Sequence, residues 1–367
     1  MIAEAARVVG GTAALVAGGW ALRALRGAPE SLGAADIGAA AKTSQNYRDG
    51  VFVNREPASE VQLTRQQQWS LIRELFTGDQ QRPGGEIPLV RPTATAPAAD
   101  LAVTWFGHSS AVIEVDGYRV LADPVWSERC SPSRAVGPQR LHPVPVELDA
   151  LPAIDAVIIS HDHYDHLDID TIKGLARSQR AKFYVPLGIG SHLRIWGVPP
   201  DRIVELDWDE SATLGELRLV CTPARHFSGR FLTRNTTLWS SWTVIGPRHR
   251  AFFGGDTGYT NGFGRIGSEY GPFDLTLMPI GAYHPGWPDI HMNPEDAVRA
   301  HRDVTDAGLL VPIHWATFRL APHPWSEPVE RLLTAASTEG VTVATPKPGQ
   351  RVDGAATARP IDAWWRL

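Results

Sequence analysis

The stretch AVIISHDHYDHLDID, residues 156–170, places three histidines and four aspartates directly after a run of apolar residues. The apolar run predicts a buried β-strand, which delivers the residues at its end in a fixed direction. His161, His163, Asp165 and His166 form the pattern H-x-H-x-D-H at that end. Imidazole nitrogens and carboxylate oxygens are ligands that zinc accepts. A polar surface turn is the alternative, but the complete pattern directly after an apolar strand favours a metal site.

Three further residues with metal-binding side chains occupy the same kind of position. His226 follows shortly after the apolar run LRLVC, Asp256 follows AFFGG, and His314 follows LLVPI. Each one alone is typical of a hydrogen-bonded polar residue, whereas all three at strand ends indicate one shared site. The total suffices for two metal ions, with three histidines for one, His314 and two cluster ligands for the other, and one aspartate between them. Gly254 and Gly255 are expected to let the backbone approach the metal closely.

From residue 101 onward, short apolar runs alternate with turns and helical stretches, which predicts one α/β domain with mixed sheets from about residue 100 to 345. The predicted strands are 101–106, 111–115, 119–122, 156–160, 182–186, 216–221, 240–246, 251–255, 275–280 and 309–314. The predicted helices are 64–76, 168–178, 293–304 and 326–337. Asn293 and Pro294 suit the N-cap and the first position of the helix at 293–304.

Residues 8–22 are fifteen uncharged, mostly apolar residues with arginines on both flanks. As a helix they reach ~22 Å, whereas the hydrocarbon core of a bilayer is ~30 Å thick. This length suits a signal-peptide core or a membrane anchor, with an interfacial or docked helix as the alternative. We therefore expect an apolar segment and linker over residues 1–44 and a membrane-associated protein, with a cytoplasmic protein as the alternative. Residues 27–60 are expected to be a poorly structured connector.

The composition limits the partners and the kind of metal site. A net charge of −5 without an evident basic patch argues against nucleic acid as a partner. Only two cysteines occur, Cys130 and Cys221, which excludes a disulfide-dense scaffold and a four-cysteine zinc site but leaves one disulfide open. The thirteen tryptophans fit core and loop positions better than a lipid-handling surface.

With these motifs in this order, the sequence resembles the metallo-β-lactamase fold superfamily. Within it, the sequence is similar to the branch of N-acylphosphatidylethanolamine-hydrolysing phospholipase D and its bacterial relatives. The resemblance covers about residues 45–340 and rests on NYRDGVFVN (46–54), WFGHSS (105–110), ADPVWSERCSPSRAVGPQR (122–140), SHDHYDHLD (160–168), LWSSWTVIGP (238–247), FFGGDTGY (252–259), GPFDLTLMPIGAY (271–283), HMNPEDAVRAH (291–301) and IHWATF (313–318). It implies an αββα sandwich with a dinuclear zinc site at one sheet edge, in a hydrolase domain of residues 45–345 followed by a tail of residues 346–367.

The resemblance also implies a role for each candidate residue. His161, His163 and His226 would hold the first zinc ion, Asp165, His166 and His314 the second, and Asp256 would bridge them. Asp123 and His291 match positions next to the metal ligands. Asp165, Asp256 and Tyr164 are the catalytic candidates. The two aspartates would orient the nucleophile or pass on a proton, and Tyr164 would contact the substrate phosphate, with an outward-packing loop tyrosine as the alternative.

Several other residues are expected to be structural. Cys221 is expected to be a buried thiol, and His108 a hydrogen-bonded core histidine with a place beside the metal ligands as the alternative. A structural role is also expected for His142, His192, His249, His301 and His323.

The expected reaction is metal-assisted hydrolysis, in which two zinc ions ~3.5–4 Å apart hold a bridging hydroxide and polarise the phosphoryl oxygen that it attacks. The resemblance favours a phospholipid substrate at a membrane surface, namely N-acylphosphatidylethanolamine, cleaved to N-acylethanolamine and phosphatidic acid. A same-fold hydrolase of a lactone, thioester or soluble phosphodiester is the alternative, and a non-catalytic zinc-binding or membrane-scaffold protein is another. The resemblance further suggests a homodimer, and iron or manganese in place of zinc stays open.

Overall fold

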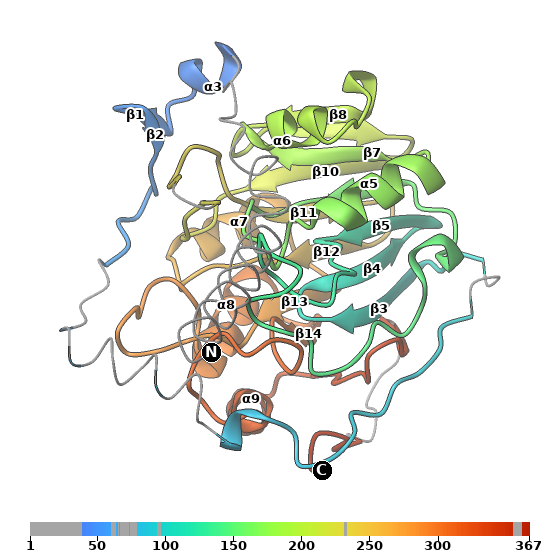
Figure 1. The fold of residues 1–367 in the computed structure, drawn as a ribbon, viewed down its shortest axis with the longest axis vertical. Helices are drawn as coiled ribbons and strands as arrows, with labels where there is room; N and C mark the ends of the chain where they lie inside the picture. The colour runs from blue at the N-terminus through green and yellow to red at the C-terminus, as the bar shows by residue number, and fades with distance from the viewer. Residues whose placement is uncertain are drawn as a thin grey trace, which may run out of the picture.

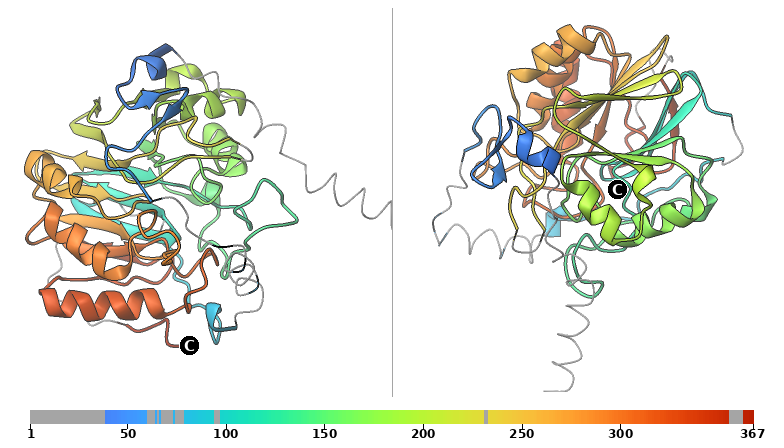
Figure 2. Two further views of the ribbon diagram at one scale, coloured as in Figure 1. Left: turned by 90° about the vertical axis from the view of Figure 1, so that its left-hand side faces the viewer. Right: turned by 90° about the horizontal axis from the view of Figure 1, so that it is seen from above.

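Two β-sheets pack face to face in the computed structural model, and helices cover the outer face of each sheet (Figures 1 and 2). The structure describes residues 39–59, 79–93, 97–230, 233–354 and 362–367, together with Thr64, Gln66 and Arg73. The predicted αββα sandwich is therefore confirmed.

The first sheet has seven strands in the order β15-β3-β4-β5-β6-β7-β8. Pairing is antiparallel from β15 to β5 and parallel from β5 to β8. Its strands are β3 (Leu101–Gly107), β4 (Ser110–Val115), β5 (Tyr118–Ala122), β6 (Ala156–Ile158), β7 (Lys182–Pro186), β8 (Ile203–Leu206) and β15 (Arg351–Asp353).

The second sheet has six strands in the order β14-β13-β12-β11-β10-β9. Pairing is parallel from β14 to β12 and antiparallel from β12 to β9. Its strands are β9 (Ser211–Leu214), β10 (Leu217–Thr222), β11 (Ser241–Ile245), β12 (Arg250–Phe253), β13 (Leu275–Pro279) and β14 (Leu309–Ile313). All ten predicted strands are present, whereas β8, β9 and β15 were not predicted.

Helices α5 (Ile169–Ser178) and α6 (Ile189–Ile195) pack on the seven-stranded sheet, and α7 (Gly262–Tyr270) and α8 (Pro294–Val304) pack on the six-stranded sheet. Helix α9 (Glu327–Glu339) lies against α8. The short 3₁₀ turns are η1 (Asp79–Gln81), η2 (Leu148–Ala150) and η3 (Pro200–Arg202). The helices predicted at 168–178, 293–304 and 326–337 are confirmed within two residues, whereas the one at 64–76 lies almost wholly outside the described residues.

Alternation along the strands builds two separate apolar layers. In β3, Val103 and Trp105 face the core between the sheets, while Phe106 faces the layer under α5 and α6. This two-residue period is what a strand covered on both faces requires. Nine of the eleven tryptophans among the described residues are buried in the core, which agrees with the expected core and loop positions.

Both ends of the described chain contribute to the domain. Residues 39–52 form α3 (Ala39–Thr43) and a two-stranded ribbon of β1 (Tyr47–Arg48) and β2 (Val51–Phe52), so the expected poorly structured connector is wrong there. The segment predicted as a tail supplies β15 and buries Trp364 and Trp365 beside Trp315.

The remaining expectations concern membrane contact and the cysteines. The apolar segment 8–22 lies outside the described residues, and no helix within the described ranges is long and apolar enough to cross a membrane. Cys130 and Cys221 are both free, buried thiols, so the disulfide that the sequence left open is not formed.

Candidate metal centre

All seven expected ligand side chains meet where strands of both sheets end. The H-x-H-x-D-H turn follows β6, and His226, Asp256 and His314 follow β10, β12 and β14. The nitrogens and oxygens of these residues form overlapping groups whose members lie within 4.8 Å of one another. All seven ligand side chains are largely or completely buried. The fold thus brings together residues that are up to 153 positions apart, from His161 to His314 (314 − 161 = 153).

The first group consists of three imidazoles. His161 Nε2 lies 2.8 Å from His163 Nδ1, and His226 Nε2 lies 3.4 Å from the same nitrogen. Two ligand atoms bound about 2.1 Å from one tetrahedral ion lie about 3.4 Å apart. The 3.4 Å separation of His163 and His226 matches the spacing of ligands on one ion, whereas the 2.8 Å separation of His161 and His163 is hydrogen-bond distance.

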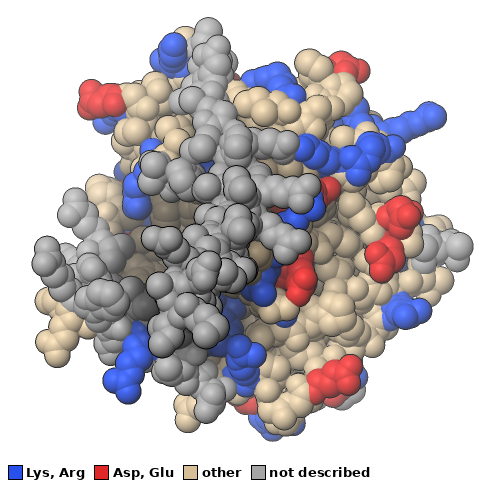
Figure 3. Space-filling model, in the orientation of Figure 1, with Lys and Arg blue, Asp and Glu red and all other residues tan. Residues whose placement is uncertain are grey.

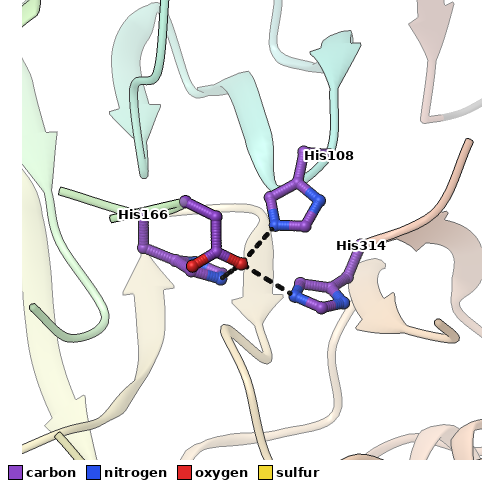
Figure 4. A group of neighbouring side chains, drawn as sticks. His108, His166 and His314 are labelled. Atoms are coloured by element: carbon purple, nitrogen blue, oxygen red, sulfur yellow. Dashed lines mark hydrogen bonds and ion pairs between the residues drawn. The ribbon is translucent and has the colours of Figure 1, made fainter. Parts of the chain in front are cut away.

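The second group gathers around Asp165. Its Oδ2 lies 3.5 Å from His166 Nε2, 3.6 Å from His314 Nε2 and 2.9 Å from His108 Nε2. Figure 4 shows these three imidazoles around one carboxylate group. His166 and His314 again have the spacing of ligands on one ion, whereas His108 is at hydrogen-bond distance.

Asp256 lies between the two groups. Its Oδ2 is 3.0 Å from His314 Nε2 and 3.2 Å from His166 Nε2, and it is 3.8 Å from His226 Nε2 and 4.0 Å from His161 Nε2. One carboxylate thus approaches nitrogens of both groups, as a bridging ligand must.

Several atoms of this centre are buried without a hydrogen bond. Among the described residues, His166 Nε2, His314 Nε2 and Asp256 Oδ1 have no hydrogen-bond partner, although the two nitrogens are close to carboxylate oxygens. Orphaned buried polar atoms are costly unless a ligand or ion satisfies them. The donor set, its spacing and these orphaned atoms fit two metal ions.

The charges of the centre are interdependent. Burial opposes ionisation of Asp165 and Asp256, but His166 and its neighbours hold the pKa of both carboxyls well below the usual value. Burial also opposes protonation of His166 and His314, yet the carboxylates raise the pKa of His166 well above its usual value and that of His314 to about 9. Burial and the neighbouring histidines keep the pKa of His161 well below its usual value. A divalent cation would supply the positive charge that protonated His166 and His314 otherwise provide.

Further residues hold the ligands in orientation. Asp123 is fully buried and accepts hydrogen bonds from His166 Nδ1 (2.7 Å), Ser160 Oγ (2.5 Å) and the Ser160 amide (2.6 Å). His226 Nδ1 donates to the Ile290 carbonyl over 2.9 Å. Such partners fix the tautomer and the plane of a ligating imidazole, so that Nε2 faces the metal.

Backbone geometry at the centre is unusual for the residue types present. His108, Asp123 and His314 have φ values of 52°, 38° and 62°, in the left-handed region that L-residues rarely adopt. Such conformations cost ~1–2 kcal/mol each and persist where the surrounding structure fixes them. Gly255 has a φ of 58°, and a Cβ there would lie 2.6 Å from Ser160 Cβ. Glycine at this position therefore lets the backbone pack closely against the start of the ligand turn, residues 160–167.

The other predicted site residues lie around this centre. His291 Nδ1 is 3.7 Å from Asp256 Oδ2, and burial lowers the pKa of His291 to about 4. The Tyr164 hydroxyl is buried without a hydrogen-bond partner in the described part of the chain, and its ring lies under the Arg230 guanidinium. His108 occupies the alternative place beside the ligands, where its Nε2–H is positioned to donate to Asp165. The catalytic and ligand roles of all these residues remain predictions.

The histidines expected to be structural lie outside the ligand groups. His142 contacts Thr317, His249 contacts Asp116, His301 contacts Thr276, His323 contacts Ala282, and His192 stacks on Trp196. None of the five belongs to a metal-ligand group formed by the described residues.

Arg230 is a residue of the centre that the sequence did not indicate. It is buried, and its Nη1 donates to the carbonyls of Asp162 (2.7 Å) and Leu167 (2.8 Å), at the two ends of the ligand turn. Its guanidinium lies 4.0 Å from the centroid of the Tyr164 ring. Its partners are more than sixty residues away in sequence, so no local pattern could have revealed it.

Two cavities are lined by residues that neighbour the centre. One of about 440 Å³ is lined by Tyr164 and Arg230, together with Arg134 and Lys173. The other, of about 710 Å³, is lined by His291 and by Tyr259, Tyr283 and nearby prolines. None of the seven expected ligands lines either cavity, and of the predicted site residues Tyr164 lines the first and His291 the second.

Residues 118–315 match the family model described as "Beta-lactamase superfamily domain", which covers more than half of the chain. The chain belongs to the metallo-β-lactamase superfamily. Together with the buried histidine and aspartate groups, this membership identifies a metal-dependent hydrolase.

Relatives of this chain include an uncharacterized protein of Mycobacterium tuberculosis, which is 64% identical over the whole of both chains. N-acyl-phosphatidylethanolamine-hydrolyzing phospholipase D 1 of Caenorhabditis elegans is 40% identical over 59% of this chain and 64% of its own length. The mitochondrial enzyme of that name from Saccharomyces cerevisiae is 32% identical over 62% of this chain and 50% of its own. The resemblance seen in the sequence is thus a distant homology to these enzymes.

Solved structures agree with the fold. A possible metal-dependent hydrolase from Veillonella parvula is 17% identical, with a TM-score of 0.56 over 70% of this chain and all of that one. A metallo hydrolase from Ignicoccus hospitalis is 24% identical, with a TM-score of 0.54 over 69% of this chain and 97% of that one. At these identities the likeness concerns the fold alone.

Proposed function

We propose that this protein is a zinc-dependent phosphodiesterase that hydrolyses N-acylphosphatidylethanolamine to N-acylethanolamine and phosphatidic acid. The observation that carries the proposal is the 40% identity over 230 residues to the Caenorhabditis elegans enzyme of that named activity. The donor set supports zinc, because five imidazoles and two carboxylates without a thiolate suit a borderline ion in an open catalytic site.

The bound ions would supply a nucleophilic water at neutral pH and stabilise the charge of the phosphoryl group in the transition state. The protein side chains prepare the site for this reaction. Asp165, held by His108, and Asp256 present carboxylate oxygens that would orient the water. Asp123 accepts the Nδ1 proton of His166, which leaves Nε2 of the neutral ring free to bind the metal.

The two cavities near the centre differ in their lining. Arg134, Lys173 and Arg230 line the first cavity beside Tyr164, which suits contact of Tyr164 with the substrate phosphate. Tyr259, Tyr283 and nearby prolines line the second beside His291, which suits an apolar part of the substrate.

Partners other than the substrate belong to the same proposal. A lipid substrate requires contact with a membrane surface, and we propose that the apolar residues 8–22 provide it. We also propose a homodimer and no nucleic-acid partner. Where grey atoms do not cover the face in Figure 3, basic and acidic side chains both occur, so this visible part is not the purely basic surface that a polyanion would favour.

The test is to incubate the full chain, loaded with zinc, with N-acylphosphatidylethanolamine in detergent micelles and to measure both products by mass spectrometry. His163→Ala and Asp256→Asn should abolish product release, because each removes a ligand. His249→Ala serves as a matched control, since His249 bonds to Asp116 outside the centre and should keep full activity.

The outcomes separate the reaction class from the substrate. Both products from the wild type and the control alone would support the proposal. Zinc binding with intact lipid would disprove the substrate assignment and favour the alternative hydrolase, to be tested on lactones, thioesters and soluble phosphodiesters. Product release that is unaffected by Asp256→Asn would disprove the assigned centre.

A further inference from the structure

The segment of residues 46–59, called here the N-terminal wrap, contacts a predicted metal ligand directly. The Asn54 side chain donates from Nδ2 to the His226 carbonyl (2.8 Å) and accepts at Oδ1 from the His226 amide (3.1 Å). The same Oδ1 accepts from Trp239 Nε1 over 3.0 Å. One amide side chain therefore satisfies both backbone groups of His226, from 172 residues earlier in the chain.

The wrap is itself anchored on the N-terminal side of Asn54. The fully buried Phe52 donates its amide to the Asn235 carbonyl over 2.8 Å. Earlier in the wrap, Asn46 Nδ2 donates to Asp207 Oδ1 over 2.9 Å. Asn54 is therefore held at a fixed place against His226.

A second set of contacts joins the end of the wrap to the loop that precedes His291. Asp289 accepts from the Ser59 amide (3.0 Å) and hydroxyl, and from Arg225 Nη1 (2.9 Å). Arg225 also donates to the Pro57 carbonyl from Nε and Nη2. Arg225 and Asp289 are the neighbours of His226 and of Ile290, and Ile290 accepts the His226 Nδ1 proton.

The wrap therefore contacts the groups that hold both the backbone and the ring of His226. Asn54 fixes the backbone of His226, and the contacts of Pro57 and Ser59 fix the carbonyl that orients its ring. A site that must hold ligand atoms within ~0.5 Å depends on such supporting contacts. The anchor at Asn46 is different, because its partner Asp207 lies outside the metal-ligand groups of the described chain.

We propose that the N-terminal wrap is a positioning element of the metal centre, and that Asn54 sets the position of His226 for the ion shared with His161 and His163. The inference rests on the proposed metal centre but not on the identity of the substrate. If the wrap only stabilised the fold, removing any of its contacts would lower the free energy of unfolding without changing zinc affinity. If it positions His226, removing the Asn54 contact lowers the affinity for one of the two ions.

The experiment compares Asn54→Ala with Asn46→Ala in the full chain. Zinc affinity and stoichiometry are measured by competition with a chromophoric chelator, and stability by urea unfolding of the metal-free protein. We expect Asn54→Ala to lower the affinity for one of the two zinc ions by at least about 10-fold and to leave the affinity for the other unchanged. Asn46→Ala should lower stability without changing either zinc affinity.

Asn54→Asp gives an independent test should Asn54→Ala fail to fold. It keeps an acceptor for the His226 amide and Trp239 but places a carboxylate oxygen against the His226 carbonyl in place of the donor, so we again expect a loss at the same ion. Wild-type zinc affinities in a folded Asn54 variant would overturn the inference, and so would equal losses in Asn54→Ala and Asn46→Ala. Since zinc binding is measured without lipid, a failed lipid assay leaves this result unaffected.

Discussion

Asp123 accepts three hydrogen bonds in a fully buried position, one of them from the His166 ring. Asp123→Asn keeps the size of the side chain but removes the charged acceptor for His166 Nδ1. Loss of such a partner typically weakens metal affinity by about 10–100-fold. We expect a decrease of that order for the ion predicted to bind Asp165, His166 and His314, measured by chelator competition.

Asp116 offers a matched control for this substitution. It accepts from His249 Nδ1 (2.7 Å) and from the Arg248 amide (2.8 Å), which repeats the chemistry of Asp123 around a histidine outside the ligand groups of the described residues. Asp116→Asn should change stability and leave zinc affinity as it is. Equal zinc affinities in the two variants would contradict a role for Asp123 at the metal.

Gly255 makes a second residue-scale prediction. Its φ of 58° costs an L-residue ~1–2 kcal/mol, and a Cβ would clash with Ser160 in the ligand turn. Gly255→Ala should therefore lower both the melting temperature and the zinc content of the purified protein.

The control is Gly264→Ala on the exposed side of α7, where a Cβ meets nothing within 4 Å. That substitution should be neutral or stabilise the protein by up to about 1 kcal/mol, because alanine favours a helix. A Gly255 variant that is as stable as the Gly264 variant would show that the turn does not require glycine.

Single residues also show where sequence reasoning ends. His161, His163 and the other five ligand candidates were predictable because each follows an apolar strand, and these strands of the two packed sheets end at the same edge of the sandwich. Asn54 and Arg230 were not predictable, because their partners are distant in sequence. Asn54 bonds to His226, 172 residues away, and Arg230 bonds to the Asp162 carbonyl, 68 residues away. Only the packed fold shows which backbone groups such side chains reach.

At the scale of elements, the start of α8 depends on one side chain. Asn293 Oδ1 accepts from the Asp296 amide over 2.8 Å and closes the first turn. Asn293→Ala should cost ~1 kcal/mol of unfolding free energy, measured by urea denaturation. Asn261 precedes α7 without a capping hydrogen bond from its side chain, so Asn261→Ala should change stability little. Equal losses at both helices would contradict the capping argument.

The elements that were predicted differ in kind from those that were not. Helix α8 has a capping residue, a proline at its start and acids in its first turn, so local chemistry identifies it. By contrast, β15 has three residues, of which only Val352 is buried, and it exists because it pairs with β3. Helix α7 contains two interior glycines, Gly264 and Gly267, which weaken its local signal, and burial of Phe263 and Ile266 compensates.

At the scale of the whole molecule, the packing of helices on sheets buries neutral histidines away from the metal centre. His301 on α8 contacts Thr276 in β13 through Nδ1 over 2.7 Å, and burial lowers the pKa of His301 to about 4. An unfolded chain protonates the same histidine near pH 6.5. Because the unfolded state then binds more protons, this residue makes stability fall as pH decreases from about 6.5 to 4, and it has no effect above that range.

The prediction concerns the slope of stability against pH. For His301 alone, the linkage amounts to about 1–2 kcal/mol between pH 7 and pH 5. His301→Asn should be less stable than wild type at pH 7, since the side chain is smaller, yet should lose less stability on acidification by that amount. Urea unfolding of the metal-free proteins at both pH values excludes the effect of metal release from the comparison. Parallel pH profiles for the two proteins would mean that His301 has the same pKa in the folded and unfolded chain, and the acid sensitivity of the molecule would then have to come from other buried groups.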